Sequence, residues 1–194
     1  MGVTAAQLLD PNQRVACAST PRLSVNTGIY ALFVVTGSSN AWEALRINAE
    51  PSGLLYVGVA TDGLDRRYHP AERSCRTSSP RFSFGAMLHD RIVPHLKPAA
   101  ATSDQRAHWR FEPESEAQLS AWMQANLSYN AVEWRGSRKE LEACEDRLIR
   151  LLKPPLNIKL LRGEDRRLLK AVRAACKATA RARRDAGSTA ESVP

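Results

Sequence analysis

The chain has 194 residues, 43% of them hydrophobic, and a formal net charge of +8. This length and composition predict one folded domain with appendages, and no apolar run is long enough to span a membrane. The N-terminus lacks the basic and then apolar order of a secretory signal, and the four cysteines form no CxxC or Cys–His pair. We therefore expect a cytoplasmic protein with reduced thiols, no zinc site and no membrane partner.

The positive charge is concentrated near the C-terminus. Residues 162–194 hold nine lysines and arginines against four acids, whereas the rest of the chain holds nineteen against sixteen. A basic segment on a nearly balanced body favours a polyanionic partner, with nucleic acid first. A solubilising helix without such a partner would have the same composition, so charge alone leaves both interpretations open.

Two strands are predicted in the first third of the chain, after a short helix within residues 4–9. The runs GIYALFVV (28–35) and LLYVGVA (54–60) are apolar at consecutive positions. This pattern is typical of strands covered on both faces, and antiparallel pairing is their simplest arrangement. Gly58 in the second run predicts a close approach by a neighbouring backbone. The intervening segment, 37–53, is expected to be loop-like at both ends, with a short helix near its middle.

The middle of the chain is predicted to hold a turn, a helix and a third strand. Residues 61–73 are typical of a turn that enters a short helix. An amphipathic helix is indicated by apolar residues at helical spacing, namely Phe84, Met87, Leu88 and Ile92. The alternating run HWRFEPE (108–114) is predicted as the third strand, and NAVEW (130–134) as a brief extended piece.

Two capping boxes, Ser115 with Gln118 and Ser137 with Glu140, predict helix starts in the second half of the chain. Together the elements predict the α+β class, with a small, mostly antiparallel three-stranded sheet flanked by helices. The expected divisions of the chain are an N-terminal extension (1–22), one domain (23–161) with an insert at about 37–53, a basic helix (162–185) and a disordered tail (186–194).

A carboxylate lies on the apolar face of the helix that begins after Ser137. Glu145 is four residues after Leu141 and four before Ile149, so the three side chains share one face. Burying an unpaired carboxylate costs several kcal/mol. We therefore expect a cation, an arginine or a pocket open to solvent beside Glu145. The other interpretation is that Glu145 borders the apolar stripe and points outward.

Five short elements occur in order between residues 27 and 158. They are Gly28-Ile29-Tyr30, Tyr56-Val57-Gly58, an L-x-x-R pattern ending at Arg67, and the ends of the pattern E-x-x-L-I-x-x-x-x-P-x-x-N, Glu145 and Asn157. Each is weak evidence alone. Their order and spacing together resemble the GIY-YIG nuclease superfamily, in particular its stand-alone bacterial members.

The resemblance implies a role for each matching residue. Tyr30 would act as general base for the attacking water, directly or through a neighbour, and Tyr56 would position that water or the phosphate. Arg67 would contact the scissile phosphate. Glu145 would hold a single divalent metal ion, Mg²⁺ or Mn²⁺, and needs no further carboxylate because Mg²⁺ keeps several waters. Asn157, Gly28 and Gly58 would support the site.

Three features depart from the family pattern. Segment 37–53 is a long insert between the two tyrosine motifs and adds a loop near the active face that could bind substrate or a partner. The L-x-x-R pattern selects Arg67, whereas the interval from the second tyrosine fits Arg66. We take Arg67, because one extra residue in the turn TDG (61–63) would lengthen the interval from the second tyrosine by one position. The histidine or tyrosine that follows the arginine in many members would have to be Tyr68 or His69, and an ordinary surface histidine explains His69 equally well.

Further phosphate contacts are predicted outside the motifs. Arg81 resembles an arginine that precedes a helix in some bacterial members, and it could face phosphate or simply lie at a helix start. On the basic helix, the predicted nucleic-acid contacts are Arg166, Arg167, Lys170 and Arg173. Deleting residues 163–194 is accordingly expected to weaken binding and leave the metal site intact.

The resemblance implies a metal-dependent DNA endonuclease, with RNA left open as a substrate. Because no zinc finger or helix-turn-helix signature accompanies the motifs, we expect structure-selective or weakly sequence-selective cutting, as in DNA repair or restriction. One alternative is a catalytically weak nucleic-acid-binding module with the same fold. A second is a fold-only protein whose basic tail binds a protein or RNA. The order of the five elements favours the endonuclease.

Overall fold

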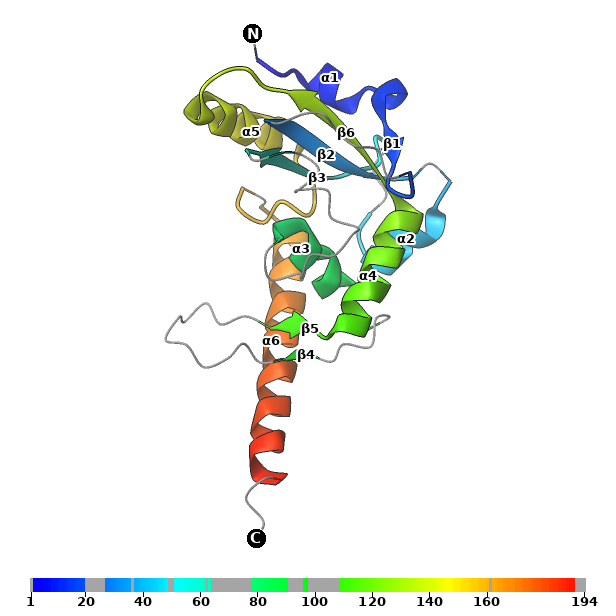
Figure 1. Ribbon diagram of the computed structural model, residues 1–194, viewed down its shortest axis with the longest axis vertical. Coiled ribbons are helices and arrows are strands. Elements are labelled where there is room, and N and C mark those ends of the chain that lie inside the picture. The colour runs from blue at the N-terminus through cyan, green and yellow to red at the C-terminus, as the bar shows by residue number, and fades with distance from the viewer. Residues whose placement is uncertain are drawn as a thin grey trace.

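The computed structural model describes residues 2–19, 27–35, 37–48, 51–61, 63, 78–90, 96–97, 109–160 and 162–190. The fold contains a four-stranded antiparallel sheet with the order β1-β6-β2-β3 (Figure 1). Its strands are β1 (Val15–Ala16), β2 (Gly28–Val34), β3 (Leu54–Ala60) and β6 (Leu127–Glu133). A second sheet pairs β4 (Leu96–Lys97) with β5 (Arg110–Phe111).

Six helices occur in the described residues. They are α1 (Ala5–Leu9), α2 (Ser39–Leu45), α3 (Ser79–Met87), α4 (Pro113–Asn126), α5 (Arg138–Leu152) and α6 (Glu164–Ala190), and a 3-10 turn spans Pro11–Gln13. The capping box at the start of α5 is confirmed, because Ser137 and Glu140 exchange side-chain and backbone hydrogen bonds. The other predicted box is wrong: α4 begins at Pro113, and Ser115 is buried in its first turn.

The α+β class is confirmed, but the predicted third strand is wrong. In the sheet the third partner is β6, whereas the strand formed within the described part of the run 108–114 is β5, Arg110–Phe111, which pairs with β4 instead. The extended piece predicted at 130–134 overlaps the second half of β6, but two buried polar residues, Ser128 and Asn130, hide the pattern of the full strand. Asn130 is buried because its amide donates hydrogen bonds of 2.9 and 3.0 Å to the carbonyls of Gln7 and Leu8 at the end of α1.

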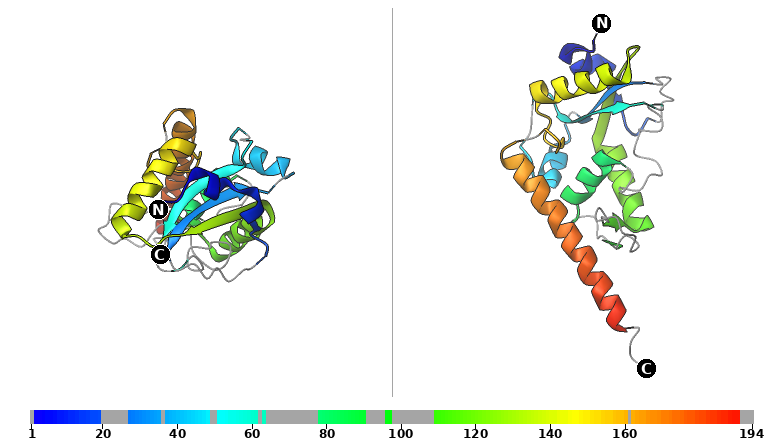
Figure 2. Two further views of the ribbon diagram at one scale, coloured as in Figure 1. Left: turned by 90° about the horizontal axis from the view of Figure 1, so that it is seen from above. Right: turned by 90° about the vertical axis from the view of Figure 1, so that its left-hand side faces the viewer.

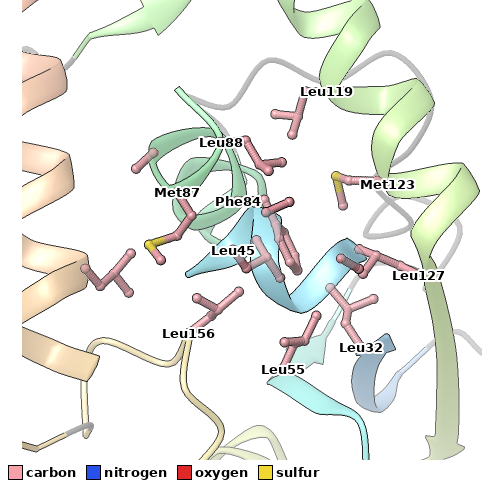
Figure 3. Packing of buried hydrophobic residues seen from close by; sticks show 14 of the residues in the cluster. Leu32, Leu45, Leu55, Phe84, Met87, Leu88, Leu119, Met123, Leu127 and Leu156 are labelled. Atoms are coloured by element: carbon pink, nitrogen blue, oxygen red, sulfur yellow. The ribbon is translucent and has the colours of Figure 1, made fainter. Parts of the chain in front are cut away.

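The sheet separates two apolar core clusters. Alternate residues of β2 enter each one: Ile29, Ala31 and Phe33 pack with α1 and α5, whereas Tyr30, Leu32 and Val34 pack with the cluster that holds α3, α4 and α6. The views in Figures 1 and 2 show α5 on one side of the sheet and α3, α4 and α6 on the other. Figure 3 shows the second cluster from close by. The continuous apolar run of β2 thus reflects burial on both faces, as predicted.

The insert between β2 and β3 packs against the domain rather than forming a free loop. It contains α2, whose Ala41, Ala44 and Leu45 are buried in the core beside α3. The insert joins the end of β2 to the start of β3, four residues beyond Tyr30 along β2. At about 3.3 Å per strand residue, that places it about 13 Å from the tyrosine.

The C-terminal helix is part of the same core. Leu169, Val172, Cys176 and Ala180 recur every three or four residues along α6 and are all buried against the cluster that includes α3. The helix continues to Ala190, past residue 185 where the sequence predicted its end. Figure 1 shows its last turns extending away from the sheet. In the part of the chain that the structure describes, no helix is both long and apolar enough to cross a membrane.

Candidate active site

The two motif tyrosines lie side by side on neighbouring strands. Tyr30 on β2 is buried and lies opposite Gly58 of β3, while Tyr56 on β3 is half-buried. Their ring centroids are 6.1 Å apart and the ring planes are tilted by 34°. A diagonal pair on one face of an antiparallel sheet has this relationship, so the strand pairing itself brings the phenols together.

Gly58 leaves space for the first tyrosine. A Cβ atom at this position would lie 2.8 Å from the Tyr30 hydroxyl oxygen and 2.8 Å from Cε1 of Tyr56. Both distances are shorter than van der Waals contact, so any side chain here would push the two rings away. The sequence predicted a close approach by backbone at Gly58, whereas the structure shows that the approaching group is a phenol.

Glu145 lies at the border of the apolar stripe of α5 and faces a pocket. Leu141, Cys144, Leu148 and Ile149 of this helix are buried, whereas Glu145 is half-buried. The carboxylate lines a pocket of about 160 Å³ together with Tyr56, Asn157 and Arg173. A pocket beside the carboxylate is one of the forms of compensation that its position on the helix predicted.

Asn157 fixes the segment that leaves α5 onto the free edge of β3. Its side-chain oxygen accepts a hydrogen bond of 2.8 Å from the Val57 backbone N–H, and its amide donates one of 2.6 Å to the Val57 carbonyl. The Leu156 N–H adds a third bond, of 3.0 Å, to the carbonyl of Leu55. Asn157 therefore pairs with the backbone beside Tyr56 as a neighbouring strand would, and it forms part of the pocket wall.

Replacing Asn157 with alanine should lower the free energy of unfolding by about 2–4 kcal/mol, because it leaves the buried N–H and C=O of Val57 without partners. Urea denaturation of the variant and the wild type would measure the loss. Asn12→Ala, at an exposed position, is the matched control and should change stability by less than about 0.5 kcal/mol. Equal stability of Asn157→Ala and the wild type would show that the two hydrogen bonds are not needed.

Arg173 lies in the same pocket rather than on an exposed tail. Its guanidinium donates a hydrogen bond of 2.6 Å to the Ser83 hydroxyl and lies 4.7 Å from the centroid of the Phe82 ring. Burial lowers the pKa of Arg173, and the neighbouring Tyr56 partly offsets this effect. Because an arginine stays charged even so, the pocket holds a fixed cation.

A signal for the position of Arg173 was present in the sequence. Arg173 follows Leu169 by four residues and precedes Cys176 by three, so it borders the apolar stripe of α6. Glu145 was singled out by the same spacing on α5. In a helix rich in arginine, however, this position is easily read as one more surface charge.

Arg81 is not a nucleic-acid contact, which corrects the expectation that it could face phosphate. Its side chain is fully buried and forms an ion pair of 2.6 Å with Glu116. It also donates hydrogen bonds of 3.0 Å to the Glu116 carbonyl and to the Ser120 hydroxyl. These contacts join α3 to α4, and the sequence offers no local sign of them because the partner lies 35 residues away.

The remaining predicted residues are distributed as follows. Gly28 begins β2, opposite Ala60 and Glu133. Arg167 and Lys170 are exposed on α6, and Arg166 is half-buried. The expected phosphate-binding arginines Arg66 and Arg67, and also His69, lie outside the described residues.

The described residues contain no cluster of three or more His, Cys, Asp or Glu side chains placed to share a metal ion. Glu145 is therefore the candidate ligand that the pocket offers. A single carboxylate suits Mg²⁺, which prefers oxygen ligands and retains much of its water.

An antiparallel sheet with paired phenols next to a pocket that holds one carboxylate and one guanidinium defines a candidate phosphodiesterase. A model of the GIY-YIG catalytic domain matches residues 28–175, and the chain belongs to this family. The matched region contains both tyrosines, Glu145, Asn157 and the first half of α6 with Arg173. GIY-YIG domains are typical of nucleases, which hydrolyse phosphodiester bonds in nucleic acids. No curated protein and no solved structure matches the chain.

Proposed function

We propose that this protein is a metal-dependent DNA endonuclease that is structure-selective or weakly sequence-selective. The observation that carries the proposal is the convergence of Tyr56, Glu145 and Arg173 on one pocket, with Tyr30 directly beside Tyr56. These groups come from β3, α5, α6 and β2. A nuclease site gives a reason for an acid, a guanidinium and a phenol to line one pocket, with a second phenol packed behind the first.

The chemistry of the donors fits a divalent metal ion held by Glu145. When bound there, Mg²⁺ or Mn²⁺ would act as a Lewis acid that offsets charge on the phosphate oxygens. Glu145 is half-buried and lines a pocket of about 160 Å³, which leaves room for a hydrated cation beside it. A bound cation would also offset the cost of partly desolvating this carboxylate.

The protein side chains would carry the remaining steps. Tyr56 orients a water molecule, and Tyr30, as a phenolate, accepts its proton while the water oxygen bonds to phosphorus and the ester oxygen leaves. A free tyrosine has a pKa of about 10, and a metal ion at Glu145 together with Arg67 would favour the phenolate. A correctly placed general base contributes about 10²–10⁴-fold.

The guanidinium of Arg173 would hold the phosphate against this site. An arginine binds phosphate through paired N–H donors and stabilises the charge that builds up during hydrolysis. Only one hydrogen bond of Arg173, to Ser83, is formed within the described residues, and its Nε makes none there. Arg67, which the family pattern assigns to the scissile phosphate, is proposed to contact that same phosphate.

A catalytically weak nucleic-acid-binding module is the second candidate, and one observation favours it. Only 4% of the Tyr30 surface is exposed, so its hydroxyl has little access to solvent. If Tyr30 stays closed off from solvent, it cannot accept the proton of the attacking water. The domain would then bind nucleic acid through its cations and cut it slowly.

A cleavage panel tests the proposal and separates the two candidates. Purified protein is incubated with labelled duplex, single-stranded, flap and branched DNA in Mg²⁺, in Mn²⁺ and in EDTA. We expect cleavage that requires the metal and favours the flap or branched substrates over the plain duplex. Tight, salt-sensitive binding without cleavage of any substrate would support the second candidate instead.

A further inference from the structure

A second, larger pocket lies between the C-terminal end of α5 and the start of α6. Its volume is about 750 Å³, and five cationic side chains line it: Arg150, Lys153, Lys159, Arg162 and Arg166. We refer to it as the basic cleft. Asp165 is the carboxylate in its lining, and Asp146 lies beside it, so positive charge is in excess.

The basic cleft adjoins the pocket of Glu145. Ile149 and Lys159 line both. Helix α6 also connects them, because Arg166 lines the cleft and Arg173 lines the smaller pocket. The two arginines are seven residues apart, which is two helical turns on one side of α6 and a rise of about 10.5 Å. A chain of phosphates that occupied the Glu145 pocket could therefore continue directly into the cleft.

Helix stability accounts for part of this charge. Arg150 and Lys153 lie at the C-terminal end of α5, where the helix dipole favours cations. Lys159 and Arg150 also reach Asp146, at 3.2 and 3.8 Å. These three residues would be explicable without any ligand.

Arg162 and Arg166 are not explained in this way. They lie at the start of α6, where the helix dipole disfavours positive charge. Within the described residues neither forms an ion pair, and the buried Nε of Arg166 makes no hydrogen bond. Cations placed against the helix dipole and lacking protein partners indicate an anionic ligand.

The backbone at Lys153 points to the same conclusion. Lys153 ends α5 in the left-handed region, with φ of 49° and ψ of 49°. Glycine is the residue favoured at such a helix end because it has no Cβ to clash. The chain instead carries a lysine there, in the lining of the cleft and in a conformation that costs stability.

We infer that the basic cleft binds the sugar–phosphate backbone of the DNA strand next to the bond held in the Glu145 pocket. This inference rests on the proposed function and adds the path of the substrate. The cleft offers charges and few uncharged hydrogen-bonding groups, so its contacts would be to phosphates and independent of sequence. Lys153, Arg162 and Arg166 would neutralise phosphates and release their counterions.

The test compares two triple variants with the same change of charge. The cleft variant carries Lys153→Gln, Arg162→Gln and Arg166→Gln. The control variant carries Arg135→Gln, Arg138→Gln and Lys139→Gln, three exposed cations at the other end of α5. Binding to fluorescent duplex DNA is measured by anisotropy in EDTA at about 50 to 300 mM NaCl. The plot of log K against log[salt] then gives the number of phosphate contacts, because its slope changes by about 0.9 for each contact.

We expect the salt slope of the cleft variant to be shallower than that of the wild type by about 2–3 and its Kd at low salt to rise at least about tenfold. The control variant should keep the wild-type slope. An unchanged slope in the cleft variant, an equal change in the control, or no measurable binding by the wild type would overturn the inference. If the wild type cleaves DNA and the slope is unchanged, the cleft alone is refuted. If the slope changes and no cleavage occurs, the nuclease assignment alone is refuted.

The single variant Lys153→Gly separates loss of charge from loss of folding. Glycine suits the left-handed conformation, so the melting temperature should equal or exceed that of the wild type. The salt slope should nevertheless become shallower by about 0.9, the contribution of one phosphate contact. A stable Lys153→Gly variant with an unchanged slope would count against a phosphate contact at this residue.

Discussion

Replacing Glu145 with glutamine should reduce metal-dependent cleavage by about 10³-fold or more, equivalent to roughly 4 kcal/mol of transition-state stabilisation. Glutamine keeps the size of the side chain and removes the charge that would hold the metal ion. The fold should persist, because Glu145 is half-buried and a neutral amide at the border of an apolar stripe is less costly to desolvate than a carboxylate. The variant should therefore still show a cooperative thermal transition.

Glu142→Gln is the matched control for this prediction. Glu142 is exposed on the same helix and pairs with Arg138 at 2.9 Å, and a surface pair of this kind contributes little. Initial cleavage rates over a range of Mg²⁺ concentrations would be compared for the two variants and the wild type, with DNA affinity measured in EDTA. Cleavage by Glu145→Gln at the rate of the control would refute the metal-binding role of the acid. Lost affinity in EDTA would mean that the residue acts on DNA binding instead.

The parts of the fold that the sequence predicted are those specified by local signals. The unbroken apolar runs around Tyr30 and Tyr56 predict strands buried on both faces, and β2 and β3 are such strands. Ser137 and Glu140 determine the start of α5 through a hydrogen-bonded box that involves only their own turn. The position of Glu145 on α5 then follows from helical geometry alone.

The errors arise where a distant partner decides the structure. Asn130 is polar in a buried strand because the end of α1, more than 120 residues away, accepts its hydrogen bonds. Arg81 looks like a surface cation until Glu116 is brought beside it by the packing of α3 on α4. No periodicity within one segment contains this information, so tertiary contacts override the local pattern.

The candidate site shows both situations at once. Glu145 and Arg173 each border the apolar stripe of a helix, and the two helices place them in one pocket across the edge of β3. The three- or four-residue spacing of a helix face could identify each residue separately as a charged side chain at the border of the apolar core. It could not show that the two charges share a pocket, because that depends on how Asn157 attaches the segment after α5 to β3.

Removal of α6 is expected to unfold the domain, which revises the expectation that deleting residues 163–194 weakens binding and leaves the metal site intact. Leu169, Val172 and Cys176 are buried in the core that contains Phe84 and Met87. Each buried aliphatic side chain contributes about 1.5–3 kcal/mol. The loss of this stripe approaches the 5–15 kcal/mol that typically stabilises a domain. A chain that ends at residue 162 should be insoluble or lack a cooperative thermal transition.

A second truncation, after residue 183, separates the structural part of α6 from the remainder. It keeps the stripe through Ala180 and also Arg166 and Arg173, so its melting temperature should stay within about 3 °C of the wild type. Circular dichroism melts and soluble yield would be measured for both truncations. A 1–162 chain that melts cooperatively near the wild-type temperature would show that α6 is only docked on the domain. If that chain also cleaved DNA at the wild-type rate, Arg173 could not belong to the site. In that case α6 would act only as a basic tail. The case for an active site at Glu145 would then rest on the family motif residues without Arg173.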